Sequence, residues 1–281
     1  MTARVFDDRT CALGEGPLWH PEREQLFWFD ILGKQLLTRD ENGPSSWSFD
    51  EYVSAAGWID HDTLLIATQS GLSRFDIATG DKSRVAALEQ DNAITRSNDG
   101  RADPWGGFWI GTMGINAEEH AGSIYRYYKG ELRKIIRGIT ISNSIAFAPD
   151  RSVAYYTDTP SRQIMQVSLS ATDGWPIGAP TLCIDLNDGG FNPDGSVVDS
   201  EGCIWNAQWG AGRVARYTAA GALIAAYDLP ATQATCPAFG GDDLRTLFVT
   251  TAAQDINGDP DGRTFQISTD THGQKEHRVI L

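Results

Sequence analysis

The sequence has no long hydrophobic run. No stretch of 18 consecutive apolar residues occurs in the 281-residue chain, so a membrane-spanning helix is not expected. The first residues, MTARVFDDRTC, lack the apolar segment of a signal peptide. We therefore expect a cytoplasmic protein with no membrane partner.

Basic residues are also few. The chain has 23 lysines and arginines against 37 aspartates and glutamates, which gives a formal net charge of −14. Binding to the phosphates of nucleic acids requires clustered Lys and Arg. The charge therefore argues against a nucleic acid partner, and against an anionic membrane surface for the same reason.

Paired cysteines and helical periodicity are missing as well. Cys11, Cys183, Cys203 and Cys236 form no C-x-x-C pair and have no His at ligand spacing, so neither a zinc site nor a redox motif is indicated. No window of about a dozen residues keeps apolar residues at positions i, i+3, i+4 and i+7. A parallel α/β fold is therefore not expected.

The sequence does contain a diffuse internal repeat of short aromatic or branched segments. Their centres are separated by 38, 44, 46, 49 and 43 residues and lie at Trp28, Ile66, Ile110, Tyr156, Trp205 and Phe248. A period of about 40 to 50 residues is typical of one four-stranded propeller blade. The sequence therefore predicts an all-β fold, a six-bladed β-propeller with four antiparallel strands per blade, formed by residues 1–281 as a single domain.

The two ends of the chain are predicted to close this ring. Residues 4–6 and 278–281 have the composition of short strands. If both segments pair in the same blade, they join the beginning of the chain to its end and leave no open edge there. This prediction rests only on β-propensity and position.

Four polar residues precede the repeat centres at nearly the same distance. Glu15, Asn98, Asn143 and Asp194 lie 13, 12, 13 and 11 residues before their centres. Equivalent positions of successive blades converge on the central axis, so these side chains are expected to meet. Turn formation alone would explain Asn or Asp beside Pro or Gly, but the shared phase favours a site.

These four residues have the chemistry of a cation site. Two carboxylates and amide oxygens, without Cys or His, suit a hard or borderline divalent cation. Ca²⁺ is the first choice, and Mn²⁺, Fe²⁺ and Zn²⁺ remain open. The second and sixth repeats carry small or apolar residues at this position, which would leave an open side for solvent and a small molecule.

Several motifs give the chain a family resemblance. LGEGPLW, SNDGRADPWGGFWIGTM, SNSIAFAPD and NPDGSVVDSEGCIWNAQWG occur in this order along it. The set resembles the gluconolactonase and senescence-marker-protein (regucalcin) family of six-bladed propellers, and the bacterial aldonolactonases that act on xylono- or arabinolactone most closely. The resemblance covers essentially the whole chain.

The resemblance assigns roles to individual residues. It implies that Glu15, Asn143 and Asp194 hold one divalent metal ion, with Asn98 beside them against metal-bound water or substrate. Arg96 would contact oxygen atoms of the substrate, although an ion pair with Asp99 or Asp103 is an alternative. An acidic residue after the GTM segment, either Glu118 or Glu119, would touch sugar hydroxyls. Trp19, Trp58 and Trp209 are candidates either for a pocket wall or for core packing.

The expected activity follows from that metal site. A divalent cation would act as a Lewis acid on the carbonyl of a pentono- or hexonolactone, and Asp194 would act as the general base that opens it to the aldonic acid. The same site could serve a metal-dependent esterase or organophosphatase, or a non-enzymatic calcium-binding propeller. A small-molecule sugar lactone is the expected partner, and the protein is expected to be a monomer or weak homo-oligomer.

Overall fold

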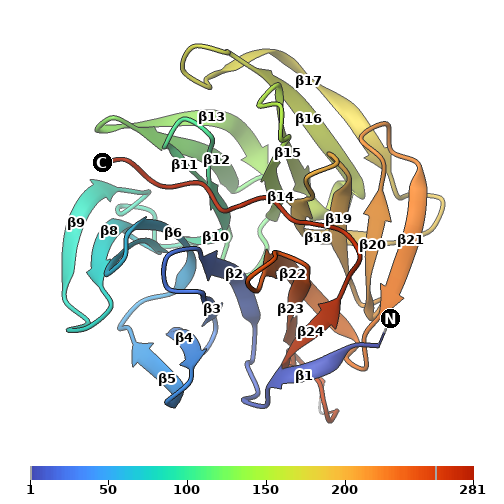
Figure 1. Cartoon of the computed structure of the whole chain (residues 1–281). Coiled ribbons are helices and arrows are strands. Elements are labelled where there is room, and N and C mark those ends of the chain that lie inside the picture. The colour runs from blue at the N-terminus through green and yellow to red at the C-terminus, as the bar shows by residue number, and fades with distance from the viewer. Residues whose placement is uncertain (1, 257) are drawn as a thin grey trace.

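The computed structural model describes residues 2–256 and 258–281. Its strands form six separate four-stranded antiparallel sheets, arranged as blades around one axis (Figure 1). This confirms the predicted six-bladed β-propeller. No helix that the structure describes could cross a lipid bilayer.

The first three blades follow one another along the chain. The first blade consists of β2 (Gly14–His20), β3 (Gln25–Asp30), β4 (Gln35–Asp40) and β5 (Gly43–Ser48). The second consists of β6 (Val53–Asp60), β7 (Thr63–Thr68), β8 (Gly71–Asp76) and β9 (Lys82–Ala87). The third consists of β10 (Thr95–Ala102), β11 (Phe108–Gly114), β12 (Gly122–Tyr128) and β13 (Glu131–Ile139).

The remaining three blades complete the ring. The fourth consists of β14 (Ser142–Phe147), β15 (Val153–Asp158), β16 (Gln163–Leu169) and β17 (Pro176–Asp185), with the short 3-10 helix η1 (Thr159–Ser161) between β15 and β16. The fifth consists of β18 (Asn192–Val198), β19 (Ile204–Trp209), β20 (Arg213–Tyr217) and β21 (Leu223–Asp228). The sixth consists of β22 (Gln233–Gly240), β23 (Thr246–Ala252), β24 (Thr264–Ser268) and β1 (Arg4–Asp7).

Burial decreases from the axis to the rim of each blade. All six residues of β3 are buried, whereas β5, at the rim of the same blade, has none buried. The strands near the axis are covered on both faces by neighbouring blades, which explains their aromatic and branched composition. Trp28, Trp109 and Trp205 come from the second strands of alternate blades and are fully buried. Removal of such large apolar side chains from water is the main force that holds the blades together.

The N-terminal strand closes the ring as predicted. β1 pairs with β24, with Arg4 opposite Gln266, and becomes the outer strand of the sixth blade. Asp7, at its end, is fully buried and its carboxylate accepts hydrogen bonds from Arg9 at 2.8 Å and from Arg39 of the first blade at 2.9 Å. These bonds tie the beginning of the chain to both blades at the seam.

The C-terminal segment does not pair in a blade, so that part of the prediction is wrong. Residues after Thr271 run across the ring, against the last residues of the innermost strands (Figure 1). Gln274 Nε2 donates to the carbonyls of Phe147 and Val198 at 3.1 and 3.0 Å, and the Val279 N–H donates to the Trp58 carbonyl at 2.8 Å. The edge of β24 is already occupied by β1, so the backbone of RVIL bonds to the carbonyls of Trp58 and Gly106 instead.

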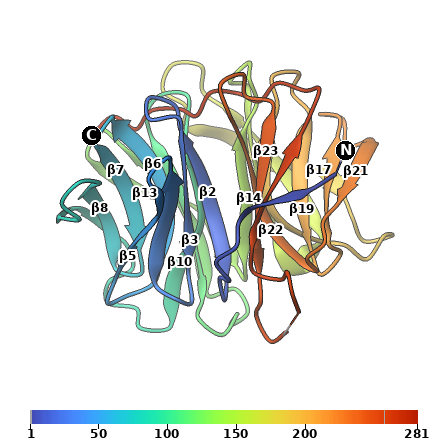
Figure 2. The same ribbon diagram turned by 60° about the horizontal axis from the view of Figure 1, so that its bottom comes forward.

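A buried ion pair anchors this C-terminal tail, residues 272–281. Glu276 of the tail binds Arg101 of β10, and both side chains are largely buried. The tail ends at the rim of the ring, where Leu281 is 40% exposed; Figure 2 shows the C-terminus at the upper edge. The tail therefore covers one end of the space between the blades and leaves the other end free.

We expect Asp7→Asn to weaken the seam. Burial alone raises the pKa of Asp7, but hydrogen bonds from Arg9 and Arg39 lower it below its ordinary value of 3.8. The ionised group therefore stabilises the fold above that pH, and this contribution is lost as the pH falls below it. At pH 7 the substitution should lower the free energy of unfolding by about 2 kcal/mol, as measured by chemical denaturation. The control is Asp8→Asn, at an exposed neighbour; an equal loss in both variants would contradict the assignment.

Candidate functional site

Each innermost strand contains a β-bulge near its beginning. A bulge inserts one extra residue and turns side chains away from the regular alternation of a strand. The register shifts lie at corresponding places in the strands, between Glu15 and Leu18 in β2, Ser97 and Gly100 in β10, Asn143 and Ala146 in β14, and Pro193 and Ser196 in β18. The four polar residues that precede the repeat centres all lie at these bulges.

The four residues occupy two kinds of position at these bulges. Glu15 and Asn143, both 13 residues before their repeat centres, are the last paired residues before a bulge. Asn98 and Asp194, at 12 and 11 residues, are the first residues within one. Glu15 and Asn143 are therefore equivalent to each other, and so are Asn98 and Asp194. The two pairs differ by one residue in their position relative to the bulge.

The backbone after Glu15 and Asn143 adopts a left-handed conformation. Gly16 has φ +54° and Ser144 has φ +59°, values that residues other than glycine rarely adopt. A Cβ on Gly16 would lie 2.2 Å from the carbonyl oxygen of Ser54, so only glycine fits between the first two blades. Ser144 instead donates its hydroxyl to the backbone carbonyl of Asp194. This bond links the fourth and fifth blades beside the site.

The predicted residues meet in one cavity of about 410 Å³. Glu15, Arg96, Asn98, Asn143 and Asp194 all line it. In the part of the chain that the structure describes, the second blade supplies no lining residue, and the sixth supplies Gln254. The cavity lies at the beginning of the innermost strands, whereas the C-terminal tail covers their ends.

A chain of hydrogen bonds fixes the amide groups of the cavity. Arg96 Nη1 donates to Asn98 Oδ1 at 2.7 Å, and Asn98 Nδ2 donates to Asn143 Oδ1 at 3.1 Å. Asn143 Nδ2 donates to Thr159 Oγ1 at 3.0 Å, and this hydroxyl donates to the Pro193 carbonyl at 2.8 Å. Thr159 could not be recognised as part of this site from the sequence, because nothing in TDTPS distinguishes it from an ordinary loop residue. The amide oxygen of Asn143 is thereby held toward the cavity.

Arg96 does not form the alternative ion pairs. Asp103 binds Arg126 at 2.6 Å, and Asp99 accepts the Ile145 N–H at 2.7 Å. The Nε atom of Arg96 is buried and has no hydrogen-bond partner among the described residues. Burial lowers the pKa of Arg96 to about 10, so the guanidinium remains charged at neutral pH. Its hydrogen bonds to the described residues both use Nη1, which leaves Nη2 available to a ligand.

The acidic groups of the cavity repel one another. Glu15 and Asp194 are 4% and 6% exposed. Burial, and then the charge of Asp99, raise the pKa of Glu15 to about 8, and burial together with the charge of Glu15 raises the pKa of Asp194 well above its ordinary value. Asp99, considered from the sequence only as a partner of Arg96, is a third buried carboxyl nearby that does not line the cavity, and burial raises its pKa to about 6 although Arg101 lies near it.

This arrangement fits a divalent cation. Two buried carboxyl groups, Glu15 and Asp194, face the single guanidinium of Arg96, so the cavity lacks positive charge. The carboxylates of Glu15 and Asp194 and the amide oxygen of Asn143 are the donor types that hard cations prefer. Burial of like charges is unfavourable without a compensating partner. The residues present therefore suit the metal that the sequence predicted.

The structure places Glu118 and Glu119 outside the cavity lining. Glu118 accepts hydrogen bonds from the backbone N–H and the side-chain amide of Asn116, both at 3.0 Å. The Glu119 side chain is 84% exposed and lies beside His120. The loop after the GTM segment does reach the cavity, but through Ile115, Asn116 and Ala117.

The three candidate tryptophans have different surroundings in the structure. Trp209 lines the cavity. Trp19 stacks on Phe248, and Trp58 donates its indole N–H to the Glu276 carbonyl at 3.0 Å. Trp19 and Trp58 are therefore part of the packed interior, and Trp209 forms part of the cavity wall.

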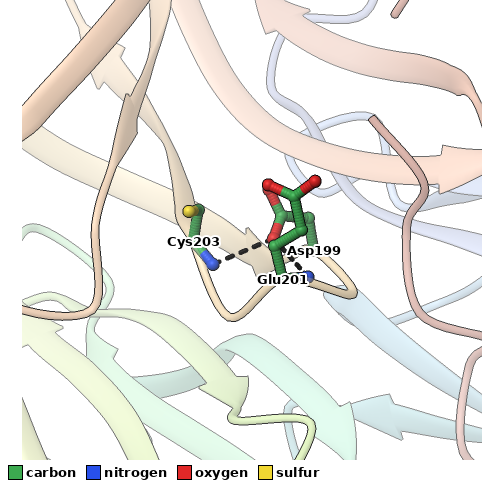
Figure 3. Close-up of side chains that lie close together, drawn as sticks. All are labelled: Asp199, Glu201 and Cys203. Atoms are coloured by element: carbon green, nitrogen blue, oxygen red, sulfur yellow. Dashed lines mark hydrogen bonds between the residues drawn. The ribbon is translucent and has the colours of Figure 1, made fainter. Parts of the chain in front are cut away.

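A second acidic cluster lies away from the cavity. Asp199, Glu201 and Cys203 place possible ligand atoms within 4.8 Å of one another (Figure 3). Asp199 Oδ1 accepts two backbone N–H groups, and Oδ2 accepts hydrogen bonds from Trp205 and Arg216. Because both oxygens are used and Arg216 supplies the compensating charge, this cluster reads as a structural ion pair.

Comparison with known proteins identifies the family. Residues 13–253 match the family described as the SMP-30/Gluconolactonase/LRE-like region. The chain belongs to this family. The membership confirms the resemblance and, with the names of the relatives, the enzyme class expected from it, a lactonase that hydrolyses a carboxylic ester.

Individual members of the gluconolactonase family are similar over nearly their whole length. The 6-deoxy-6-sulfogluconolactonase of Pseudomonas putida is 34% identical over 90% of this chain and 88% of its own. The pentonolactonase of Haloferax volcanii is 32% identical over 99% and 98%. A solved structure, described as a calcium-binding protein, regucalcin, from Agrobacterium tumefaciens, is 40% identical, has a TM-score of 0.97 and is matched over 98% of its chain.

We expect added Ca²⁺ or Mn²⁺ to stabilise this family member against unfolding. A cation that binds only the folded state adds about 2.7 kcal/mol at roughly a hundred times its Kd, and thermal denaturation with and without the metal measures this gain. Asp194→Asn should lose most of the response because a ligand charge is removed. Without metal this variant should be no less stable than the wild type, because the repulsion with Glu15 is also removed.

The matched control for this measurement is Glu201→Gln, which removes an acidic side chain from the second cluster. It should keep the full response to the cation. If the response is lost in Glu201→Gln and kept in Asp194→Asn, the cation binds at the cluster of Asp199, Glu201 and Cys203, and the predicted site in the cavity is wrong.

Proposed function

We propose that this protein is a metal-dependent lactonase that opens a pentono- or hexonolactone to its aldonic acid. The observation that carries the proposal is the convergence of Glu15, Asn143 and Asp194 on one cavity. Its volume of about 410 Å³ lies within the range of small-molecule sites. The lactonase names of the relatives in Pseudomonas putida and Haloferax volcanii support the substrate class.

Glu15, Asn143 and Asp194 would hold the metal ion. Ca²⁺ is the first candidate, since the donors are all oxygen atoms and the similar regucalcin structure is described as calcium-binding. Mn²⁺, Fe²⁺ and Zn²⁺ remain candidates because carboxylate and amide donors also accept them. When bound, the cation would supply Lewis-acid polarisation of the lactone carbonyl and stabilise the oxyanion that forms.

Asp194 would be the general base. Its carboxylate lies in the cavity beside the other proposed ligands, where it can remove a proton from the attacking water. The water oxygen bonds to the carbonyl carbon, the bond from that carbon to the ring oxygen breaks, and Asp194 returns the proton to the released oxygen. The product is the open-chain hydroxy acid, and Asp194 is regenerated.

Arg96 and Asn98 would position the substrate. The hydrogen bonds of Arg96 to the described residues use Nη1, which leaves Nη2 for the substrate, and Asn98 is held between Arg96 and Asn143. A lactone carbonyl or its adjacent hydroxyl could accept from Arg96 without displacing another hydrogen bond. Groups that are already fixed before the substrate arrives reduce the entropy lost on binding.

We expect Asp194→Asn and Asn143→Ala to reduce metal-dependent lactone opening strongly. Loss of a general base costs about 100- to 10,000-fold, and Asn143→Ala removes a metal donor together with the support of Asn98. The measurement is kcat/KM for a pentonolactone in the presence of each candidate cation, corrected for spontaneous opening. Full activity in both variants would refute the proposed site.

Glu201→Gln is the control for the acidic variants and should match the wild type. Phenyl acetate assayed beside the lactone tests the alternative substrate class. A higher kcat/KM on phenyl acetate would favour an esterase with the same metal site.

A further inference from the structure

The cavity changes character from its floor to its mouth. The charged residues that line it, Glu15, Arg96 and Asp194, are at most 6% exposed and form the floor. The more exposed lining residues form the mouth, and among those the structure describes none is charged. They are Leu32, Ile115, Asn116, Ala117, Ile141, Thr159, Trp209 and Gln254.

Asn116 is held in place at the third blade. Glu118 Oε2 accepts its backbone N–H and Oε1 accepts its side-chain Nδ2, both at 3.0 Å. The carboxylate packs so closely on Gly114 that a Cβ there would lie 2.1 Å from Oε2. With Nδ2 engaged by Glu118, the amide oxygen of Asn116 is the atom left to accept a hydrogen bond from a ligand.

Gln254 lies across the ring from Asn116. It follows β23 of the sixth blade, and the third and sixth blades are opposite one another in a ring of six. Its backbone exchanges two hydrogen bonds with the side chain of Gln233, at 2.9 and 3.1 Å. Within the described chain no hydrogen bond occupies its side-chain amide, so both its donor and its acceptor are available.

We infer that Asn116 and Gln254 determine specificity by hydrogen-bonding hydroxyl groups of an uncharged sugar lactone at the end away from its carbonyl. Glu118 is a positioning residue that acts through Asn116. The inference rests on the proposed lactonase function and names the part of the substrate that the mouth recognises. Amides suit hydroxyls because each can donate and accept, while Leu32, Ile141 and Trp209 would contact the C–H faces of the sugar.

The described residues of the mouth include no cationic side chain, and this determines which substrates should bind poorly. A phosphate, sulfonate or carboxylate on the far end of the lactone would lie beside apolar groups and amides, with no Lys, Arg or His among the described residues of the mouth to compensate it. The protein as a whole carries a formal charge of −14. Both effects disfavour an anionic substrate.

The test compares two substrates that differ in their hydroxyl groups. A pentonolactone carries hydroxyls, and γ-butyrolactone carries none. Asn116→Ala and Gln254→Ala should each lower the ratio of kcat/KM for the pentonolactone to kcat/KM for γ-butyrolactone by about tenfold, the loss expected for one hydrogen bond of about 1.4 kcal/mol. The change should fall mainly on KM, because these contacts are distant from the reacting bond.

Glu118 is tested through its dependence on Asn116. Glu118→Ala should reproduce the change in this ratio, Glu118→Gln should restore part of it by keeping one acceptor, and Glu118→Ala should add nothing in an Asn116→Ala background. Glu119→Ala is the matched control at the exposed neighbour, and it should leave the ratio at the wild-type value.

The outcomes separate the two proposals. An unchanged substrate ratio in Asn116→Ala and Gln254→Ala, while the wild type opens the pentonolactone, would overturn the specificity assignment and leave the lactonase proposal intact. Faster opening of a phosphorylated or sulfonated lactone than of its neutral counterpart would also overturn it. A wild-type protein that opens neither lactone with any candidate cation would refute the proposed function, and the inference with it.

Discussion

Repulsion among buried carboxyl groups at the centre of the ring is the constraint on which the rest of the structure depends. Glu15, Asp99 and Asp194 come from the first, third and fifth blades, so they approach one another only when the ring is closed. Arg96 supplies one positive charge against Glu15 and Asp194, and Arg101 lies near Asp99. The packed blades prevent the strands from moving apart to relieve this repulsion, and the proposed metal ion would compensate it.

The bulges in the innermost strands direct the polar side chains to this centre. A regular strand would direct alternate side chains to opposite faces, into the packing between blades. The extra residue after Glu15 and Asn143, and at Asn98 and Asp194, directs polar groups toward the axis instead. Apolar packing and polar chemistry are thus separated within a few residues of the same strand, and the hydrogen bonds between blades keep the polar groups in register.

The fold and the floor of the cavity could be predicted from the sequence, because equivalent positions of successive blades lie close together around the axis of the ring. The sequence was insufficient for the mouth, since the loop after the GTM segment presents Asn116 where an acidic residue was expected, and Gln254 lies outside every repeat motif. Loop conformation depends on local hydrogen bonds such as that between Glu118 and Asn116, which spacing does not reveal. The C-terminal prediction failed because strand propensity cannot show that β1 already occupies the available edge.

The path of the C-terminal tail has a practical consequence for how the protein can be handled. Leu281 ends at the rim, on the face away from the cavity. A fused domain or an affinity tag attached there would project away from the entrance used by small molecules. Immobilisation through that end would leave every molecule on a support with its entrance facing the bulk solution.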